Sequence, residues 1–210
     1  MSAPLKIVGV SGSLKAPSRT IELVEQIADS LGAQFESETT IIRVNELGPS
    51  FAGALERSAL PAEVEQALLA IETADVLIVA SPVYRASFTG LFKHLFDFVD
   101  QYALVDTPIL LAATGGSERH ALIIEHQFRP LFGFFQALTL PLGVYAHDSD
   151  FTDYKISSPR LRERLDKAVQ KALPLIRSNI AERDLIDRTL AGEVPHESVA
   201  DPRQVVRLLA

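Results

Sequence analysis

The chain has 210 residues, of which 47% are hydrophobic and 22% are charged, with a formal net charge of -7 and no cysteine. This composition is typical of one globular domain, or of one domain with a tail. The missing cysteine excludes disulfides, thiolate nucleophiles and cysteine-bound metals, while the acidic balance argues against nucleic acid as a partner.

The predicted elements alternate along the chain between short apolar runs and longer stretches of helical spacing. No apolar run is long enough to cross a membrane, and the N-terminal residues lack the pattern of a secretory signal, so we expect a cytoplasmic protein. The predicted strands cover residues 5–10, 39–44, 76–80, 109–113 and 140–146. The predicted helices cover residues 18–31, 61–73, 87–102, 119–138 and 158–176.

This alternation predicts the fold class. Five strands that alternate with five helices form a parallel sheet covered by helices on both faces, an α/β three-layer sandwich with the flavodoxin-like strand order 2-1-3-4-5. We expect residues 1–177 to form this domain. Residues 178–210 are charged and interrupted by prolines, with a short amphipathic piece at 204–209, and are predicted to be an arm.

The first chemical motif is the loop SGSLKAPSRT, residues 11–20, which follows the first predicted strand. Its hydroxyls lie at the amino end of a helix, where N–H groups and the helix dipole attract a phosphate. The loop lacks the glycine-lysine-serine sequence of a triphosphate site and the repeated glycines of a dinucleotide site. The alternative is that Ser18 only caps the helix and the serines form a turn. The candidate phosphate ligands are Ser11, Ser13, Ser18, Arg19 and Thr20.

Two further loops follow the third and fourth predicted strands. Pro82, Val83, Tyr84 and Arg85 combine a stiff turn with apolar and aromatic side chains, which suits a flat ring whose polar edge meets backbone N–H groups. Thr114, Gly115, Gly116 and Ser117 remove side chains where a ring would approach the backbone. Each loop alone also fits a plain turn. Neighbouring parallel strands end at the same edge of a sheet, so the three loops are expected to share one crevice.

The segments SGSLKAPSRT (11–20), SPVYRASFTGLFK (81–93) and ATGGS (113–117) resemble the NAD(P)H-dependent FMN reductases of two-component sulfonate monooxygenase systems, most closely the methanesulfonate type. The resemblance implies FMN as cofactor, NADH or NADPH as electron donor, and a partner monooxygenase that receives reduced FMN. It implies that the first loop holds the phosphate, that Pro82–Arg85 borders the ribityl chain and ring, and that Thr114–Ser117 approaches the ring.

One stretch departs from that family pattern. In the alkanesulfonate-type members, the helix after the glycine loop carries an inserted tyrosine on a π-bulge at a subunit contact. This chain has His126 at that place, so release behaviour tied to the tyrosine is not carried over, and His126 is a candidate for an interface contact or for flavin release. The Phe-rich segment 131–135 predicts a homo-oligomer, either a dimer or a tetramer.

Other chemistries have little support in this chain. His120 and His126 lie on different faces of a regular helix, so we expect no metal site. No G-x-S-x-G turn of a hydrolase is present, and hydride transfer through a flavin needs no obligatory side-chain acid or base. Two alternatives stay open: a quinone or azo reductase that retains FMN, and a flavodoxin-like electron carrier without enzymatic activity.

Overall fold

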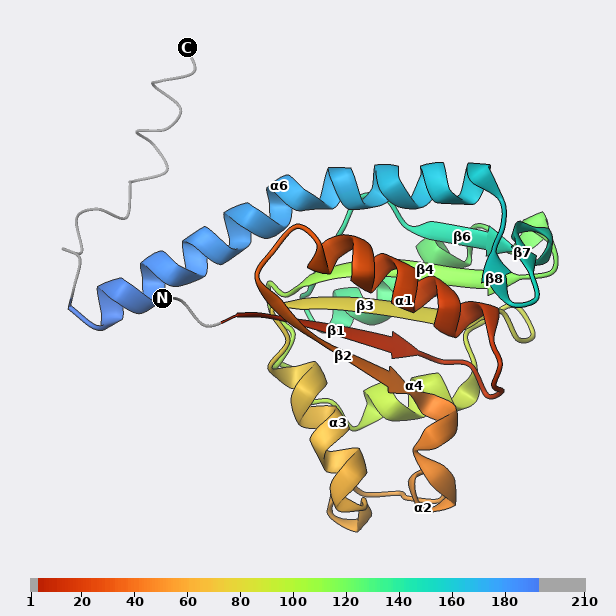
Figure 1. Cartoon of the computed structure of the whole chain (residues 1–210). Helices are drawn as coiled ribbons and strands as arrows, with labels where there is room; N and C mark the ends of the chain where they lie inside the picture. Colours follow the sequence, from red (N-terminus) through yellow and green to blue (C-terminus); the bar gives the residue numbers. More distant parts are fainter. Residues whose placement is uncertain (1–3, 193–210) are drawn as a thin grey trace. The chain divides into compact units, whose positions relative to one another are not determined.

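The computed structural model describes residues 4–192, and its centre is a parallel sheet with helices on both sides (Figure 1). The strands are β1 (Leu5–Ser11), β2 (Ser37–Arg43), β3 (Val76–Pro82), β4 (Pro108–Gly115), β5 (Leu138–Thr139) and β6 (Val144–His147). They pair in the order β2-β1-β3-β4-β5, and β6 also pairs with β4. The flavodoxin-like order predicted from the sequence is confirmed.

The helices are α1 (Arg19–Gly32), α2 (Gly48–Ala52), α3 (Ala62–Glu72), α4 (Gly90–Asp97), α5 (Arg129–Phe134) and α6 (Pro159–Leu190). In Figure 1, α1 lies on one side of the sheet, and α2, α3 and α4 lie on the other. Within residues 4–192, no helix has both the length and the apolar character that a membrane crossing needs.

Burial on both faces explains the central strands. β3 and β4 are almost entirely buried, as expected for parallel strands that are covered by helices on both sides. Beneath one face, α4 packs against α5 through aromatic rings. Phe92 contacts Phe96 and Phe128 with ring centroids 4.9 and 5.6 Å apart, and Phe96 meets Phe132 edge to face at 5.0 Å. This aromatic layer lies directly beneath the residues that follow β1, because Phe92 contacts Gly12.

The predicted long helix over residues 119–138 is wrong. The structure has a 3₁₀ turn at Glu118–His120, a π-helix at Ile124–Phe128, and then α5. Pro130 explains the break, since it has no N–H to donate to the His126 carbonyl and so removes one α-helical hydrogen bond at this point. The chain winds wider in the turn before the proline, and His126 falls inside the π-helix.

The fifth strand predicted over residues 140–146 is only partly present: β4 pairs with Leu138–Thr139, which precede the predicted strand, and with Val144–His147, and a gap separates these two pieces. Pro141 cannot donate a ladder hydrogen bond, and Gly143 marks a close approach to the π-helix. A Cβ atom at Gly143 would lie 2.7 Å from Ile124. Arg129 binds the carbonyls of Leu140 and Pro141 at 3.0 and 2.9 Å, which satisfies backbone oxygens inside the gap.

Two helix boundaries differ from the prediction. The helix predicted over residues 87–102 is shorter, because Thr89 caps α4 and the preceding residues form a tight turn. The last helix does not end at residue 176 but continues to Leu190, since no glycine or proline interrupts residues 177–190. Gly192, with φ 75°, follows the helix in the left-handed region that favours glycine.

The chain divides by contacts into two compact units, Met1–Ile176 and Arg177–Ala210. In the first unit, residues 159–176 of α6 bury an apolar face with helical spacing that includes Leu161, Leu165 and Ile176. In the second, residues 177–190 are mostly exposed, and six of these fourteen residues are charged. The amphipathic piece predicted at 204–209 lies outside the described residues.

Candidate functional site

The ends of β1, β3 and β4 lie side by side, so the loops that follow them meet at one edge of the sheet. Ser11 is in register with Ala80, and Pro82 with Thr114. Across these strand ends, the hydroxyls of Thr20 and Thr114 lie 2.6 Å apart, although 94 residues separate them. This buried pair joins the start of α1 to the end of β4 and fixes the first loop against the third.

The first loop uses its hydroxyls to hold its own shape. The Ser13 hydroxyl donates to the Lys15 carbonyl at 3.0 Å and accepts from the Lys15 N–H at 3.3 Å. The Ser18 hydroxyl accepts from the N–H groups of Thr20 and Ile21, which makes it the N-cap of α1. The capping role considered for Ser18 is therefore present, and it orders the helix end at which a phosphate would bind.

Arg19 is the first residue of α1, and part of its guanidinium points into the protein. Its Nη1 lies 3.2 Å from Asp148 Oδ1, and the guanidinium stands 5.7 Å from the centre of the Tyr154 ring. Its Nε atom is buried without a hydrogen-bond partner. A buried donor without an acceptor is costly, and a phosphate or carbonyl oxygen would satisfy it. These residues therefore fit a phosphorylated ligand at this edge.

The second loop closes in a tight turn. Tyr84 and Ser87 exchange two backbone hydrogen bonds, while Arg85 and Ala86 between them adopt left-handed φ angles of 51° and 64°. The Val83 N–H donates to the Thr114 carbonyl at 2.8 Å. The N–H groups of Val83 and Tyr84 are therefore both bonded within the protein, so in this conformation neither is available to a ligand. The half-exposed Tyr84 side chain stays available for a ring contact.

The base of the second loop is tied to the first. The Thr89 hydroxyl donates to the Gly12 carbonyl at 2.7 Å, and the Thr89 N–H donates to the buried Ser81 hydroxyl at 3.0 Å. Gly12 has no space for a side chain, since a Cβ atom there would lie 2.8 Å from Phe92. The lone glycine of the first loop is thus required by packing.

The glycines of the third loop leave room for protein side chains. A Cβ atom at Gly115 would lie 2.5 Å from the Tyr145 hydroxyl, which donates to the Ser117 carbonyl at 2.5 Å. A Cβ atom at Gly116 would lie 3.3 Å from the Asp148 carboxylate. Burial raises the pKa of Tyr145 above its usual value, although its hydrogen bond to Ser117 opposes this effect, so the hydroxyl stays protonated as a donor.

His126 is exposed on the π-helix, beside a direct link to the second loop. The neighbouring Gln127 accepts a hydrogen bond from the Ser87 hydroxyl at 3.1 Å. Within residues 4–192, no side-chain hydrogen bond or ion pair joins His126 to the three loops, so the geometry does not make it a flavin ligand. Its place on the surface of the π-helix stays compatible with a contact to another chain.

The structure adds to this edge residues from β6 and from the segment that follows it, none of which the three loop motifs include. Asp148 and Tyr154 reach Arg19, and Tyr145 supports the third loop. The signal was available in the sequence: β6 is also a parallel strand of this sheet, so the residues at its carboxyl end belong to the same edge. The helical and strand patterns did not show that this segment returns to α1.

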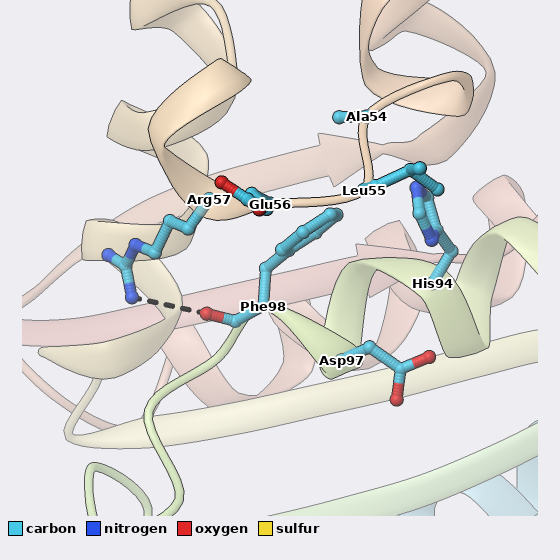
Figure 2. Close-up of a pocket in the computed structure, with 7 residues that line it drawn as sticks. All are labelled: Ala54, Leu55, Glu56, Arg57, His94, Asp97 and Phe98. Atoms are coloured by element: carbon cyan, nitrogen blue, oxygen red, sulfur yellow. Dashed lines mark hydrogen bonds between the residues drawn. The ribbon is translucent and has the colours of Figure 1, made fainter.

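A different pocket, of about 550 Å³, lies away from these loops. Figure 2 shows its lining, with Phe98 between Arg57 and His94. Arg57 is bonded to Glu65 and Glu72 and donates to the Phe98 carbonyl at 3.2 Å. The pKa of Glu65 is lowered by its hydrogen bond with Arg57. Because this guanidinium is already paired, the pocket offers no comparable site for an anion.

Among the described residues, no group of three or more histidine, aspartate or glutamate side chains is placed to hold a metal ion. Comparison with known protein families shows what the chain as a whole resembles. Residues 5–152 match the family model described as NADPH-dependent FMN reductase.

Two known proteins and one solved structure illustrate this similarity. The chain is 52% identical over 180 residues to the NADH-dependent FMN reductase SfnF of Pseudomonas fluorescens, covering 86% of this chain and 96% of that protein. It is 50% identical over 175 residues to the FMN reductase (NADPH) of Pseudomonas aeruginosa, covering 83% and 94%. The apo structure of the NADH:FMN oxidoreductase EMOB aligns with a TM-score of 0.71 and 31% identity, covering 80% of this chain and 88% of that one.

Proposed function

The chain belongs to the NADPH-dependent FMN reductase family, and we propose that it passes hydride from NADH or NADPH to FMN and supplies reduced FMN to a partner monooxygenase. The observation that carries the site assignment is the buried, unpartnered Nε atom of Arg19 at the edge where the three loops meet. It marks a place for an anionic oxygen at the amino end of α1, which is where the phosphate of FMN would be held.

Each loop has a separate task in this proposal. The first loop binds the phosphate through Ser11, Ser13, Ser18, Arg19 and Thr20. The turn Pro82–Arg85 borders the ribityl chain and one side of the ring, with Tyr84 as its exposed aromatic contact. Thr114–Ser117 supports the ring from the neighbouring strand end. When bound, FMN supplies the hydride-accepting chemistry, and the protein orients it and excludes water.

The relatives' names support the reaction and the choice of partner. The related proteins are named as NADH-dependent and as NADPH-using FMN reductases, so either donor is consistent with the family. The relatives named SfnF and SfnE support a place in sulfonate utilisation, where reduced FMN would pass to a monooxygenase. A protein that draws on the cellular NAD(P)H pool would work in the cytoplasm. Residues 1–177 would form the flavin-binding domain, and 178–210 an arm toward a neighbouring subunit or partner.

Anaerobic reduction of FMN tests this function. With catalytic amounts of the protein, NADH or NADPH is expected to bleach the long-wavelength absorbance of FMN, with one nicotinamide oxidised per flavin reduced. The two donors, compared at equal concentration, show the preference through their kcat/KM ratio. If neither donor bleaches FMN above the protein-free rate, the reductase function is wrong.

Flavin retention and electron transfer separate the two alternatives. A protein that releases FMN during gel filtration fits a supplier of reduced flavin. Retention of the yellow flavin together with rapid reduction of a quinone or an azo dye would favour the retaining reductase instead. Bound flavin without any NAD(P)H oxidation would favour an electron carrier.

We also propose a homo-oligomer, either a dimer or a tetramer, assembled through α5 and the π-helix. A hollow of about 510 Å³ lies between α4 and α5, and its lining combines apolar residues such as Phe96 and Phe135 with the charged residues Lys93 and Asp97. Phe134, at its rim, is 63% exposed, which is unusual for phenylalanine. His126 lies on the same stretch of chain and is the polar contact expected at this interface.

Light scattering is expected to give a mass of two or four times the 22.9 kDa of one chain. Phe134→Glu should shift the protein toward the monomer, because a carboxylate would be desolvated at the interface. Leu55→Glu is a matched control: Leu55 is 92% exposed and lies on the loop after α2, so the mass should not change. A wild-type monomer at micromolar concentration, or equal effects of both substitutions, would contradict this interface.

A further inference from the structure

Two side chains from outside the first loop, Asp148 and Tyr154, contact the guanidinium of Arg19, and the proposed site gives them no role. Asp148 and Tyr154 both come from the segment after β6, more than 120 residues from Arg19 in the sequence. Asp148 engages one end of the guanidinium, and the Tyr154 ring covers its face. The opposite atom, Nε, is the one that is buried without a partner.

This segment, residues 147–157, is itself firmly anchored. The Asp150 carboxylate accepts from the His147 N–H and from Arg164, both at 2.9 Å. Burial alone would raise the pKa of Asp150, but these hydrogen bonds and the Arg164 charge lower it below its usual value, so the anchor is ionised. A second anchor is the ion pair of Lys155 with Glu22 at 2.5 Å, which ties the segment to the first turn of α1.

Tyr154 occupies a turn position whose backbone conformation does not suit its bulky side chain. Residues 151–156 form a small hairpin of β7 (Phe151–Thr152) and β8 (Lys155–Ile156). Its two turn residues, Asp153 and Tyr154, have φ angles of 47° and 63°. Such turns favour asparagine or aspartate followed by glycine, so a tyrosine at the second position is strained. In this turn conformation, the ring of Tyr154 lies against the guanidinium of Arg19.

We propose that Asp148 and Tyr154 are positioning residues that aim Arg19 at the 5′-phosphate of the flavin, so that segment 147–157 determines the preference for FMN over riboflavin. This inference rests on the proposed function of the strand-end site. Asp148 fixes the plane of the guanidinium from the solvent side, and Tyr154 prevents it from swinging off α1. The unpartnered Nε–H then stays directed inward, toward the phosphate.

The position of Asp148 argues for alignment of Arg19 and against simple charge neutralisation. Its other carboxylate oxygen lies beside Gly116, where a Cβ atom would be only 3.3 Å away. The carboxylate is therefore wedged between the glycine loop and Arg19. An aspartate that merely repelled phosphate would lower FMN affinity, and its removal would raise it. If Asp148 instead aligns Arg19, then removing its charge should lower FMN affinity.

The test compares the dissociation constants of FMN and riboflavin, which differ only in the phosphate, by quenching of flavin fluorescence. Asp148→Asn is expected to weaken FMN binding about tenfold and to leave riboflavin binding within about twofold. Arg19→Ala should remove most of the preference for FMN, and Asp148→Asn should then have no further effect in the Arg19→Ala protein. Asp153→Asn is the matched control, because it removes an equal charge from the same segment, 147–157, at a residue that makes no ion pair with Arg19.

The variant Tyr154→Gly distinguishes a role of Tyr154 in positioning Arg19 from a role in the stability of the fold. Glycine relieves the left-handed strain, so Tm should stay equal or rise, while FMN affinity falls severalfold. Tyr154→Phe restores the ring and should recover the affinity. Equal losses for FMN and riboflavin, tighter FMN binding by Asp148→Asn, or a Tyr154→Gly protein of unchanged affinity would each overturn the proposal. A wild-type protein that binds neither flavin would instead refute the proposed function.

Discussion

Phe92→Ala is expected to destabilise the protein by about 3–5 kcal/mol, the range for truncation of a fully buried phenylalanine. Phe92 is 0% exposed and touches the rings of Phe88, Phe96 and Phe128. Alanine would leave a cavity at the centre of this aromatic layer and remove the surface on which Gly12 rests. The free energy of unfolding, from urea titration followed by circular dichroism, measures the loss.

A surface aromatic residue provides the control for this substitution. Tyr102 is 65% exposed, and Tyr102→Ala should change the free energy of unfolding by less than about 0.5 kcal/mol. The folded fraction of the Phe92→Ala protein should also bind FMN more weakly, because the first loop loses its support. A loss below about 1 kcal/mol would show that the aromatic layer repacks around the gap and does not hold the loop.

Gly115→Ala is expected to cost about 1–3 kcal/mol of stability and to weaken FMN binding at least severalfold. The added methyl group would lie 2.5 Å from the Tyr145 hydroxyl, a distance that no relaxed structure permits. Either Tyr145 must leave its hydrogen bond to the Ser117 carbonyl, or the end of β4 must move. Both movements distort the third loop. Thermal unfolding and flavin fluorescence measure the two effects.

The cause can be isolated by a second substitution. Tyr145→Phe removes the hydroxyl that the new methyl group meets, so the double variant Gly115→Ala/Tyr145→Phe should be more stable than Gly115→Ala alone. Tyr145→Phe by itself loses one hydrogen bond, with an expected cost of about 1 kcal/mol. Additive costs in the double variant would show that the steric conflict lies elsewhere, for example with Val83.

The regular part of the fold could be predicted because its sequence patterns are local. Buried strands such as β3 read as unbroken apolar runs, and α1 shows its helical spacing and its Ser18 cap. The predictions failed where one residue competes with the pattern. Pro130 forces the π-helix inside an apparently continuous helix, and Pro141 divides the fifth strand. The spacing of apolar residues does not by itself predict either break.

The site could be predicted only in outline. The convergence of three loops follows from parallel strands that end at one edge, and the pair of Thr20 with Thr114 shows it directly. The partners of Arg19 could not be found in this way, because a two-residue turn brings Tyr154 back to α1 across a long separation in sequence. The packing role of Gly115 likewise depends on Tyr145, whose position becomes known only once β6 is placed.

The interrupted strand at the β5/β6 edge has a consequence for how copies of the protein can meet. A long, regular outer strand can pair with the same strand of another molecule and extend the sheet without limit. Here that edge consists of two residues, a gap that contains Pro141, and four more residues, so it offers no continuous row of donors and acceptors. Growth of a fibre by sheet extension is therefore blocked at this side of the sheet, and β2 remains as its one regular edge strand among the described residues.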